Sequence, residues 1–319
     1  MDRIRPGSAR LLERVLLGDG GIKTRHFAYP ELAEVFSASP DDLAAVFEDQ
    51  APRLASRALE VALDRVGLGA CELDALFVCT CTGSLCPGVS SYVAELSGLP
   101  RDAYLQDLVG LGCGAAIPTL RSAHGFLAAN PGAKSACIAV EVCSAAFYLD
   151  DDPGQLISLS LFGDGASTSI WYGPEASGAD EAKYELAGFD TVHLPEEREK
   201  IRFVQANGYR KNQLSPEVPM LSADAVRLLW QRSEAEDTIP ITHGGGRDVV
   251  NALEPVLGLQ HGGLEASRKV LEMRGNLSSP SVLVALEDHL EALSSAPQPV
   301  WLSSFGAGFS AHSALLRPV

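Results

Sequence analysis

The chain alternates apolar stretches with amphipathic stretches, and this alternation restricts its fold more than any other feature of the sequence. Helical periodicity covers residues 53–68, 87–99 and 115–130, and strand-like apolar runs cover residues 75–81 and 135–144. Strands that alternate with helices along a chain are typical of a sheet covered by helices. The sequence therefore predicts an α/β fold.

The same alternation continues after a turn-rich break. Residues 156–173 are predicted to form two strands separated at Gly-Asp-Gly, and the polar stretch 174–185 is the expected boundary between two halves. This boundary separates residues 1–173 from residues 174–319, which gives two α/β halves of similar size. In the second half we expect helices over 221–234, 247–259 and 280–293 and strands over 238–243 and 299–316.

Composition and charge exclude several kinds of partner. The 319 residues include 25 Lys or Arg and 41 Asp or Glu, and the net charge of −16 repels nucleic acid and anionic membranes. No apolar run approaches the ~18 residues of a membrane helix, and the N-terminal segment lacks the apolar core of a secretory signal. We therefore expect a cytoplasmic protein that does not contact membranes.

The seven cysteines are an odd number in a long chain, and we expect them to be reduced thiols rather than a disulfide framework. Cys79 and Cys81 are separated by one residue, with no neighbouring His and no second cysteine pair to complete a tetrahedral site. No metal site is expected.

Three polar residues each stand at the edge of a predicted element, beside glycine. Cys113 precedes a predicted helix, whose free N–H groups and positive dipole end are expected to lower the thiol pKa. His243 ends a predicted strand and is followed by three glycines, and Asn276 lies between two turn segments. Taken singly, Cys113 is also compatible with a role as a small buried core residue, and Asn276 is also compatible with a role as a helix cap or turn residue. Together the three fit a nucleophile, its base and a polar stabiliser.

A papain-like protease uses the same chain order of Cys, His and Asn. The signature that surrounds the cysteine in such proteases, C-G-[SA]-C-[WY], is absent from this chain. The protease interpretation is therefore disfavoured.

The segments around these residues resemble those of type III polyketide synthases, the chalcone-synthase-like condensing enzymes with the thiolase fold. The family's nucleophile segment resembles LGCGAA, and its strand-to-helix turn that carries the histidine resembles HGGGRDVVNALEPVLGL. Its asparagine segment resembles SRKVLEMRGNLSSPSVLVAL. SLFGDGAS and SFGAGFS resemble two further loops, and the resemblance runs from about Lys23 to the C-terminus. It implies a thiolase-like αβαβα layered fold made of two similar halves.

The resemblance also implies a reaction and a role for each of the three residues. Cys113 would carry the acyl group, and His243 and Asn276 would hold the malonyl thioester carbonyl and stabilise the enolate left by CO2 loss. The implied reaction is decarboxylative condensation of an acyl-CoA starter with malonyl-CoA, followed by cyclisation to a pyrone or phenolic product. No metal or redox cofactor is required, and a homodimer is implied.

Several residues match the family's substrate cavity. Phe162 matches an aromatic gatekeeper between the CoA tunnel and the cavity, although a core phenylalanine before a turn fits the same pattern. Cys81 and Cys143 match positions in the starter cavity, and a cysteine at position 81 resembles the bacterial naphthol- and pyrone-forming members. Cys86 matches the residue that crosses the dimer interface into the partner's cavity.

The second gatekeeper departs from the family pattern. Lys211 or Asn212 occupies the place of the aromatic residue, which predicts a wider or more polar cavity. Gly306 and Gly308 of the SFGAGFS loop complete the predicted substrate site.

The start of the chain also departs from the family pattern. The resemblance implies a strand, central to the first sheet, and a helix before GGIKTRHFAYPEL, but only about twenty residues precede that segment and they show no strand pattern. Basic residues expected to bind the CoA phosphates are displaced, which leaves Arg10 and Arg14 as candidates, with Asp19 where a cation is expected. Both arginines also fit a solvated helix face.

These departures keep two alternative functions open. One is a stand-alone ketosynthase or acyltransferase supplied by an acyl carrier protein, although carrier proteins are acidic and the net charge of −16 disfavours such a partner. The other is a catalytically silent homologue that acts as a partner subunit.

Overall fold

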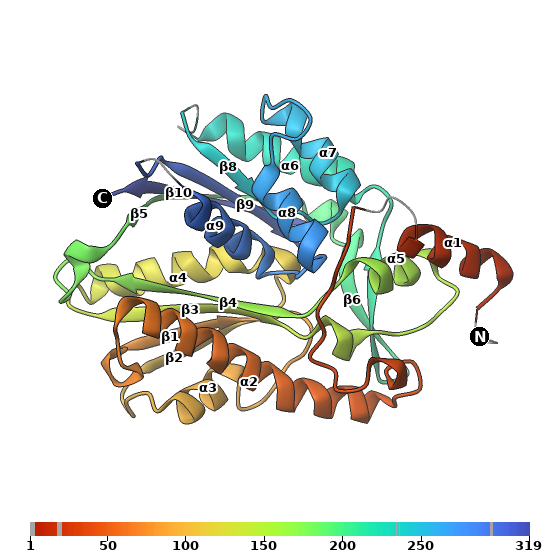
Figure 1. Cartoon of the computed structure of the whole chain (residues 1–319), viewed down its shortest axis with the longest axis horizontal. Coiled ribbons are helices and arrows are strands. Elements are labelled where there is room, and N and C mark those ends of the chain that lie inside the picture. The colour runs from red at the N-terminus through yellow and green to blue at the C-terminus, as the bar shows by residue number, and fades with distance from the viewer. Residues whose placement is uncertain (1–3, 18–20, 234, 236, 294–295) are drawn as a thin grey trace.

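The chain folds into alternating layers of helices and sheets (Figure 1). The computed structural model describes residues 4–17, 21–233, 235, 237–293 and 296–319. These residues form two four-stranded sheets and one two-stranded sheet. None of their helices combines the length and apolar character needed to cross a lipid bilayer.

The first sheet is built by strands that precede residue 173. Its neighbouring strands pair in parallel, except for the last pair, which is antiparallel. The strands β1 and β3 are buried along their whole length, as expected for strands covered on both faces. In sheet order the strands are β2 (Tyr104–Leu108), β1 (Ala75–Cys79), β3 (Lys134–Glu141) and β4 (Gly165–Tyr172).

The second sheet is built by strands that follow residue 183. A parallel pair, β8 with β9, is followed by the antiparallel pairs β9 with β10 and β10 with β5. In sheet order the strands are β8 (Ile239–Thr242), β9 (Val300–Gly306), β10 (Ser310–Pro318) and β5 (Tyr184–His193).

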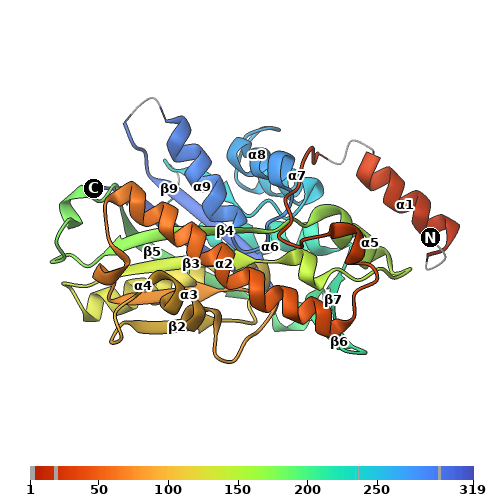
Figure 2. The same ribbon diagram turned by 60° about the horizontal axis from the view of Figure 1, so that its bottom comes forward.

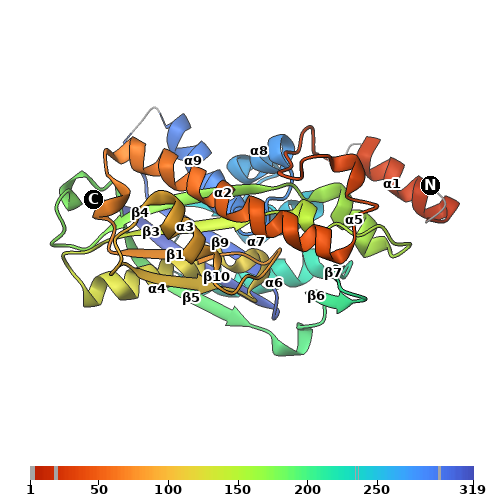
Figure 3. The same ribbon diagram turned by 90° about the horizontal axis from the view of Figure 1, so that it is seen from below.

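Helices cover both faces of each sheet, and two of them contact both sheets. These central helices are α4 (Ala116–Ala129) and α9 (Ser281–Ala292). Figure 3, seen from below, shows α2 and α3 along the outer face of the first sheet. The helices of the two outer layers are α2 (Pro40–Val66), α3 (Val89–Ser97), α6 (Val218–Arg232) and α7 (Arg247–Val256). Helix α8 (Glu265–Arg274) packs against α9, and its Val270 belongs to the core between the two sheets. The predicted αβαβα layering in two similar halves is confirmed.

One end of the molecule carries elements that lie outside these layers. Figure 2 shows α1 (Pro6–Leu17) at this end, beside α5 (Pro153–Leu161). A hairpin of β6 (Ile201–Ala206) and β7 (Tyr209–Leu214) packs against α5. Short 3-10 helices occur at Leu32–Glu34, Ala70–Glu72, Gly112–Gly114 (η3), Cys143–Ala146 (η4), Ala179–Glu181 and Pro195–Glu197.

The family's first strand was expected at the centre of the first sheet, and the strand order of this sheet shows that this position is wrong. All four strands of the first sheet pair directly with their neighbours, so no place is open at the centre of this sheet. When β1, β3 and β4 are matched to β8, β9 and β10, the strand β5 at the edge of the second sheet has no counterpart beside β4. The described residues before Ala75 contain no strand. The element without a counterpart is therefore an edge strand.

Two element predictions are wrong in part. Residues 156–161, predicted as a strand, belong to helix α5, because Asp152 caps the helix by accepting from the Gln155 N–H and Pro153 fixes the first turn. Helix α2 begins at Pro40 rather than near residue 53, because Ser39 and Asp42 form a capping box there.

Candidate active site

Cys113 lies in the turn that leads from β2 into α4. The turn is η3, and α4 starts two residues after it, so the cysteine stands just before the helix as predicted. Its side chain is 7% exposed. Gly112 has a φ of +59°, a left-handed conformation that a residue with a side chain rarely adopts.

The loop after β9 packs directly against this turn. A Cβ atom on Gly306 would lie 2.5 Å from the backbone nitrogen of Gly114 and 3.0 Å from that of Cys113. Only glycine permits this approach. Gly306 therefore contacts the backbone of the nucleophile turn rather than the cavity wall.

Beside Cys113 lies a buried carboxylate, that of Glu141 at the end of β3. Its Oε2 accepts from Thr80 Oγ1 and from the backbone N–H and hydroxyl groups of Thr82, and its Oε1 accepts from Ser279 Oγ at 2.5 Å. Glu141 is 0% exposed, so these donors replace the water that a charged carboxylate would otherwise bind.

Ser278 connects this carboxylate to the thiols. Its Oγ lies 3.1 Å from Cys113 Sγ, 3.3 Å from Cys81 Sγ and 3.3 Å from Glu141 Oε1. Because a hydroxyl both donates and accepts, Ser278 can donate a hydrogen bond to a Cys113 thiolate or accept one from a thiol.

His243 follows β8 and is fixed by the strand next to it. Its backbone N–H donates to Ser303 O at 2.8 Å, and its ring lies against that of Phe305, with 5.1 Å between the centroids. The side chain is 1% exposed, and Nδ1 has no hydrogen-bond partner among the described residues. Burial lowers the pKa of His243 to about 4, so the imidazole is neutral near pH 7.

Asn276 is held by its backbone and by both ends of its amide. The backbone N–H donates to Leu161 O at 2.8 Å, and Nδ2 donates to Gly245 O at 2.7 Å. Oδ1 accepts from the Ser278 N–H at 2.8 Å. Since an amide nitrogen carries two protons, one N–H of Asn276 remains available for a ligand.

A short chain of contacts connects the three predicted catalytic residues. Asn276 bonds to Gly245 in the turn after His243, and its neighbour Ser278 contacts the sulfur of Cys113. The His243 ring packs on Phe305, which directly precedes the glycine that contacts the Cys113 backbone. The fold thus gathers three residues that are up to 163 positions apart in the sequence.

The expectation of a lowered thiol pKa at Cys113 is wrong. Burial raises the pKa to about 12, which outweighs the hydrogen bond from Ser278 that lowers it, and the carboxylate of Glu141 raises it further. Burial likewise raises the pKa values of Cys81 and Cys143 well above the ordinary value. The site therefore holds neutral thiols beside a neutral imidazole, and the proton of Cys113 must leave during any reaction with an acyl group.

A cavity with about 40 Å³ of free space opens in front of Cys113. Its wall includes the predicted residues Cys81, Cys143 and Phe162. His243 and Asn276 are buried and do not line it, and Asn276 is joined to two wall residues, Ser278 through its amide and Phe162 through the backbone. Apart from Arg202 and the thiols, the lining residues are apolar or carry uncharged polar groups. The cavity thus suits an uncharged acyl chain attached to Cys113.

At the second gatekeeper position, the residue that faces the cavity is Asn212. Its Nδ2 donates to Ser158 Oγ at 3.1 Å, whereas Lys211 pairs with Asp150 at 2.8 Å and takes no part in the wall. Phe203, which pairs with Asn212 across the hairpin, supplies an aromatic side to the cavity.

Besides Gly306, two further predicted residues lie away from the cavity of their own chain. Gly308 does not line it, which corrects the prediction, because the turn at φ +117° directs Gly308 toward His193, whose Nε2 donates to Gly308 O at 2.9 Å. Its neighbour Ala307 lines the cavity instead. Cys86 is exposed in the loop between β1 and α3, before a cis peptide bond to Pro87.

The predicted CoA-binding arginines lie on α1. Arg10 is exposed on this helix, which packs against α5 and so lies near the end of the cavity that carries Phe162. Asp19 and the side chain of Arg14 lie outside the described residues.

Two residues of the site, Glu141 and Ser278, were not predicted from the sequence. An acidic residue at the end of an otherwise apolar, buried strand was the available signal for Glu141. Ser278 lies two residues after Asn276 and has a φ of +60°, which is uncommon outside glycine. The described residues contain no group of three or more His, Cys, Asp or Glu side chains placed to bind a metal ion.

Comparison with solved structures defines the class of the fold. The chain superposes on 1,3,6,8-tetrahydroxynaphthalene synthase from Streptomyces coelicolor A3(2) with a TM-score of 0.87 and 24% identity, covering 98% of this chain and 89% of that chain. The C-terminal type III polyketide synthase domain of Steely1 from Dictyostelium superposes with a TM-score of 0.87 and 23% identity. This superposition covers 98% of this chain and 89% of that chain. The fold is that of type III polyketide synthases, condensing enzymes with the thiolase fold.

Sequence comparison identifies the family. The profile of the N-terminal domain of chalcone and stilbene synthases matches residues 23–174, and that of the C-terminal domain matches residues 213–318. The chain belongs to the chalcone and stilbene synthase family.

Bacterial members of the family are among its relatives. The chain is 32% identical to 1,3,6,8-tetrahydroxynaphthalene synthase of Streptomyces peucetius subsp. caesius, over 98% of this chain and 85% of that protein. It is 31% identical to 3,5-dihydroxyphenylacetyl-CoA synthase of Streptomyces toyocaensis, over 88% of this chain and 75% of that protein.

Proposed function

We propose that the protein condenses an acyl-CoA starter with malonyl-CoA on Cys113 and releases a pyrone or phenolic product. The observation that carries this proposal is the arrangement of Cys113 in the wall of a cavity, with its sulfur linked through Ser278 to the Asn276 amide and through that amide to the turn after the buried His243. Relatives whose names describe phenolic products or a CoA thioester support it.

The first step loads the starter. The sulfur of Cys113 attacks the thioester carbonyl of the acyl-CoA, the acyl group moves to the sulfur, and CoA leaves as its thiol. The thiol proton must be removed first, because burial raises the pKa of Cys113 to about 12. The neutral imidazole of His243 is the base that we assign to this step.

The second step forms the carbon–carbon bond. The malonyl carboxylate leaves as CO2, and the electron pair of the broken bond forms the enolate of the acetyl thioester. An N–H of His243 and the free N–H of Asn276 stabilise the enolate oxygen, and the enolate carbon attacks the acyl group on Cys113. The chain grows by two carbons and the sulfur is released. We expect no metal or redox cofactor, because the departing CO2 leaves the electron pair that forms the new bond.

Purified protein given malonyl-CoA and a panel of acyl-CoA starters tests this proposal. We expect release of CO2 with a condensed product, loss of that product in Cys113→Ala, and retention in Cys71→Ala, which alters an exposed cysteine. A wild-type rate no higher than that of Cys113→Ala would overturn the proposal and favour a silent partner subunit. Turnover only with acyl groups bound to a carrier protein would instead support the ketosynthase alternative.

We further propose that the protein is a homodimer joined along β2. This strand lies at the free edge of the first sheet, and exposed apolar side chains flank it, with Leu96 at 61%, Tyr104 at 48% and Val109 at 57%. An unpaired edge beside apolar side chains favours pairing with a second strand. The loop that contains the exposed Cys86 ends against this strand, where Gly88 packs on Asp107, and the resemblance assigns Cys86 to the partner's cavity.

Native mass spectrometry tests the dimer. We expect twice the 33.7 kDa chain mass for the wild type, a monomer for Val109→Glu, and a dimer for the control Val61→Glu, which alters an exposed valine on α2. A monomeric wild type would contradict the proposal.

A further inference from the structure

A segment near the N-terminus joins the two halves of the molecule beside the cavity. This segment, residues 22–28, is called the N-terminal strap, and it runs between α1 and α2 past the end of α5 (Figures 1 and 2). At one end the Lys23 N–H donates to Glu272 O in α8 at 2.6 Å. At the other end the Ala28 N–H donates to Asp164 Oδ2 at 2.7 Å.

The middle of the strap carries Arg25, a half-buried residue that binds the end of α5. Its Nη1 donates to Leu159 O at 2.6 Å and to Phe162 O at 3.0 Å. Carbonyl groups in the last turn of a helix have no partner within the helix, so a cation placed there satisfies them and offsets the negative end of the helix dipole. The carboxylate of Asp164 lies near enough to interact with the Arg25 charge.

The helix end that Arg25 binds is also the part of α5 that contacts the site. Phe162 lies in the cavity wall. Leu161 O accepts from the Asn276 N–H at 2.8 Å, and the Gly163 N–H donates to Asn276 O at 3.0 Å. The backbone on both sides of the Asn276 side chain is therefore bonded to this helix end.

The strap, the end of α5 and the Asn276 segment pack closely against one another. A Cβ atom on Gly275 would lie 2.7 Å from Leu161 O and 2.8 Å from Cγ of Arg25. A Cβ atom on Gly163 would lie 2.7 Å from Arg274 O. Displacement of the helix end would therefore also displace the Asn276 segment.

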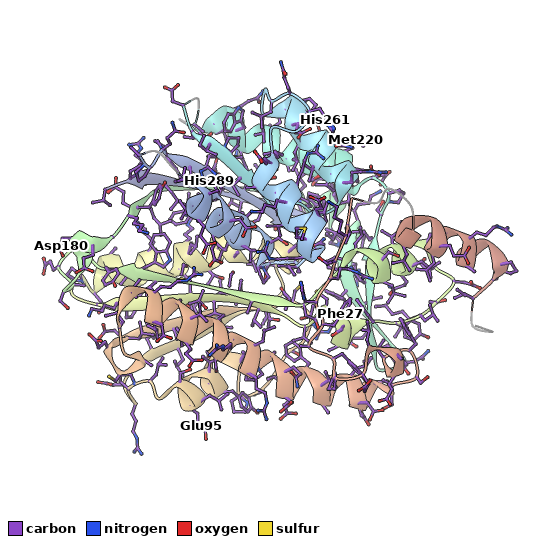
Figure 4. All side chains as sticks on the ribbon, viewed as in Figure 1. Phe27, Glu95, Asp180, Met220, His261 and His289 are labelled. Atoms are coloured by element: carbon purple, nitrogen blue, oxygen red, sulfur yellow. The ribbon has the colours of Figure 1, made fainter. Side chains whose placement is uncertain are left out.

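Arg25 also contacts a second part of the cavity wall, through Phe27. Its guanidinium lies over the ring of Phe27, 5.1 Å from the centroid, and that ring meets Phe147 edge to face at 5.8 Å. Phe147 lines the cavity. Figure 4 labels Phe27, on the strap where it passes the right-hand end of the first sheet.

We propose that Arg25 is a positioning residue, which sets the place of Phe162 in the cavity wall and of the Asn276 amide beside it. The role at Asn276 rests on the proposed function, because it concerns the stabilisation of a malonyl-derived enolate. The role at Phe162 concerns only the shape of the cavity. The two roles are measured separately.

Alkylation of Cys113 by reagents of two sizes tests the role at Phe162 without any catalytic turnover. The variants are Arg25→Met, which keeps side-chain length but no donors, and the control Arg65→Met, which breaks an exposed ion pair with Glu291 at the C-terminal end of α2. The rates of Cys113 modification by iodoacetamide and by N-phenylmaleimide are followed by peptide mass spectrometry. We expect Arg25→Met to change the ratio of the two rates by roughly 10-fold and Arg65→Met to leave it unchanged. A ratio in Arg25→Met equal to that of the wild type would overturn the proposal.

Decarboxylation of malonyl-CoA tests the role at Asn276. We expect Arg25→Met to lower kcat by roughly 10-fold with little change in KM, and to have no further effect in the Asn276→Ala background. Additive effects of the two changes would overturn this role. A wild type that does not decarboxylate malonyl-CoA would refute the proposed function, and the alkylation ratio would still decide the role at Phe162.

Arg25→Lys keeps the positive charge but replaces the planar guanidinium group by a compact ammonium group. We expect smaller shifts in the same direction for both measurements. If Arg25→Met does not fold, this variant decides the proposal, and wild-type values in both measurements would overturn it.

Discussion

The hydroxyl of Ser278 lies 3.1 Å from the sulfur of Cys113 and donates a hydrogen bond to it. The same oxygen lies 3.3 Å from Glu141, so the nucleophile is tied to a buried carboxylate through one side chain. This relationship and the burial of the site set the protonation state of the thiol.

Replacement of Ser278 by alanine removes the one hydrogen bond from a side chain that lowers the Cys113 pKa. A hydrogen bond to a charged group contributes about 1.5–3 kcal/mol, so we expect the thiolate to form less readily and alkylation of Cys113 to slow by roughly 10-fold or more. The rate of iodoacetamide modification between pH 7 and 10 measures this effect. Ser279→Ala is the control, because Ser279 binds the same carboxylate without contacting Cys113. Equal rates in the two variants would contradict the assigned role.

Glu141→Gln is expected to lower the free energy of unfolding by about 2–4 kcal/mol. The amide introduces an N–H2 group where hydroxyl and backbone groups already donate to Glu141, and the fully buried site offers no water to relieve this conflict. Urea denaturation measures the loss. The control is Glu95→Gln, an exposed residue on α3 that Figure 4 places on the outer surface. An unfolding free energy as high as that of the control would show that the carboxylate is not required.

The glycine at position 306 provides a test of the nucleophile turn. In Gly306→Ala the new Cβ would lie 2.5 Å from the nitrogen of Gly114, so the turn that holds Cys113 must shift. We expect a loss of stability of about 1–3 kcal/mol and a large loss of activity. Gly125→Ala in α4 is the matched control, since nothing lies within 4 Å of its Cβ, and it is expected to be neutral or stabilising. Thermal unfolding and product formation are measured on both, and full activity in Gly306→Ala would contradict the described packing.

Burial of His243 predicts a specific loss of stability in acid. Its pKa falls to about 4 in the folded protein from the ordinary 6.5, so the unfolded state binds more protons between these values and stability falls as the pH falls through this window. The contribution is fully present above pH 6.5. We expect the wild type to lose roughly 2–3 kcal/mol more than His243→Gln between pH 6.5 and 4.5.

Urea denaturation across that pH range measures the difference. His312 has a similarly lowered pKa of about 4, but it is present in both proteins and its effect cancels. Parallel losses in the two proteins would show that His243 is not buried in the neutral form.

The sequence predicted the alternation of strands and helices because periodicity is a local property of the chain. Cys113, His243 and Asn276 were found because each lies in a glycine-rich junction, where the backbone conformation can be read from a few residues. Asp152 and Pro153 carried an equally local signal for α5, but the apolar residues that follow them were interpreted as a strand.

Other features depend on contacts between distant segments, and a single sequence does not disclose them. Phe203 reaches the cavity only because β6 pairs with β7, which places it opposite Asn212. Arg25 meets the carbonyl of Phe162 across 137 positions of the chain. The thiol pKa was predicted in the wrong direction because the helix end is evident in the sequence, whereas the extent of burial is a property of the folded chain.

The central claim is that Cys113 carries the acyl chain during the reaction. Intact-protein and peptide mass spectrometry after brief incubation with an acyl-CoA tests this claim most directly. We predict one added acyl group, located on Cys113, present in the wild type and in Cys71→Ala and absent from Cys113→Ala. A folded wild type that acquires no acyl group, or that acquires it on another cysteine, would contradict the account.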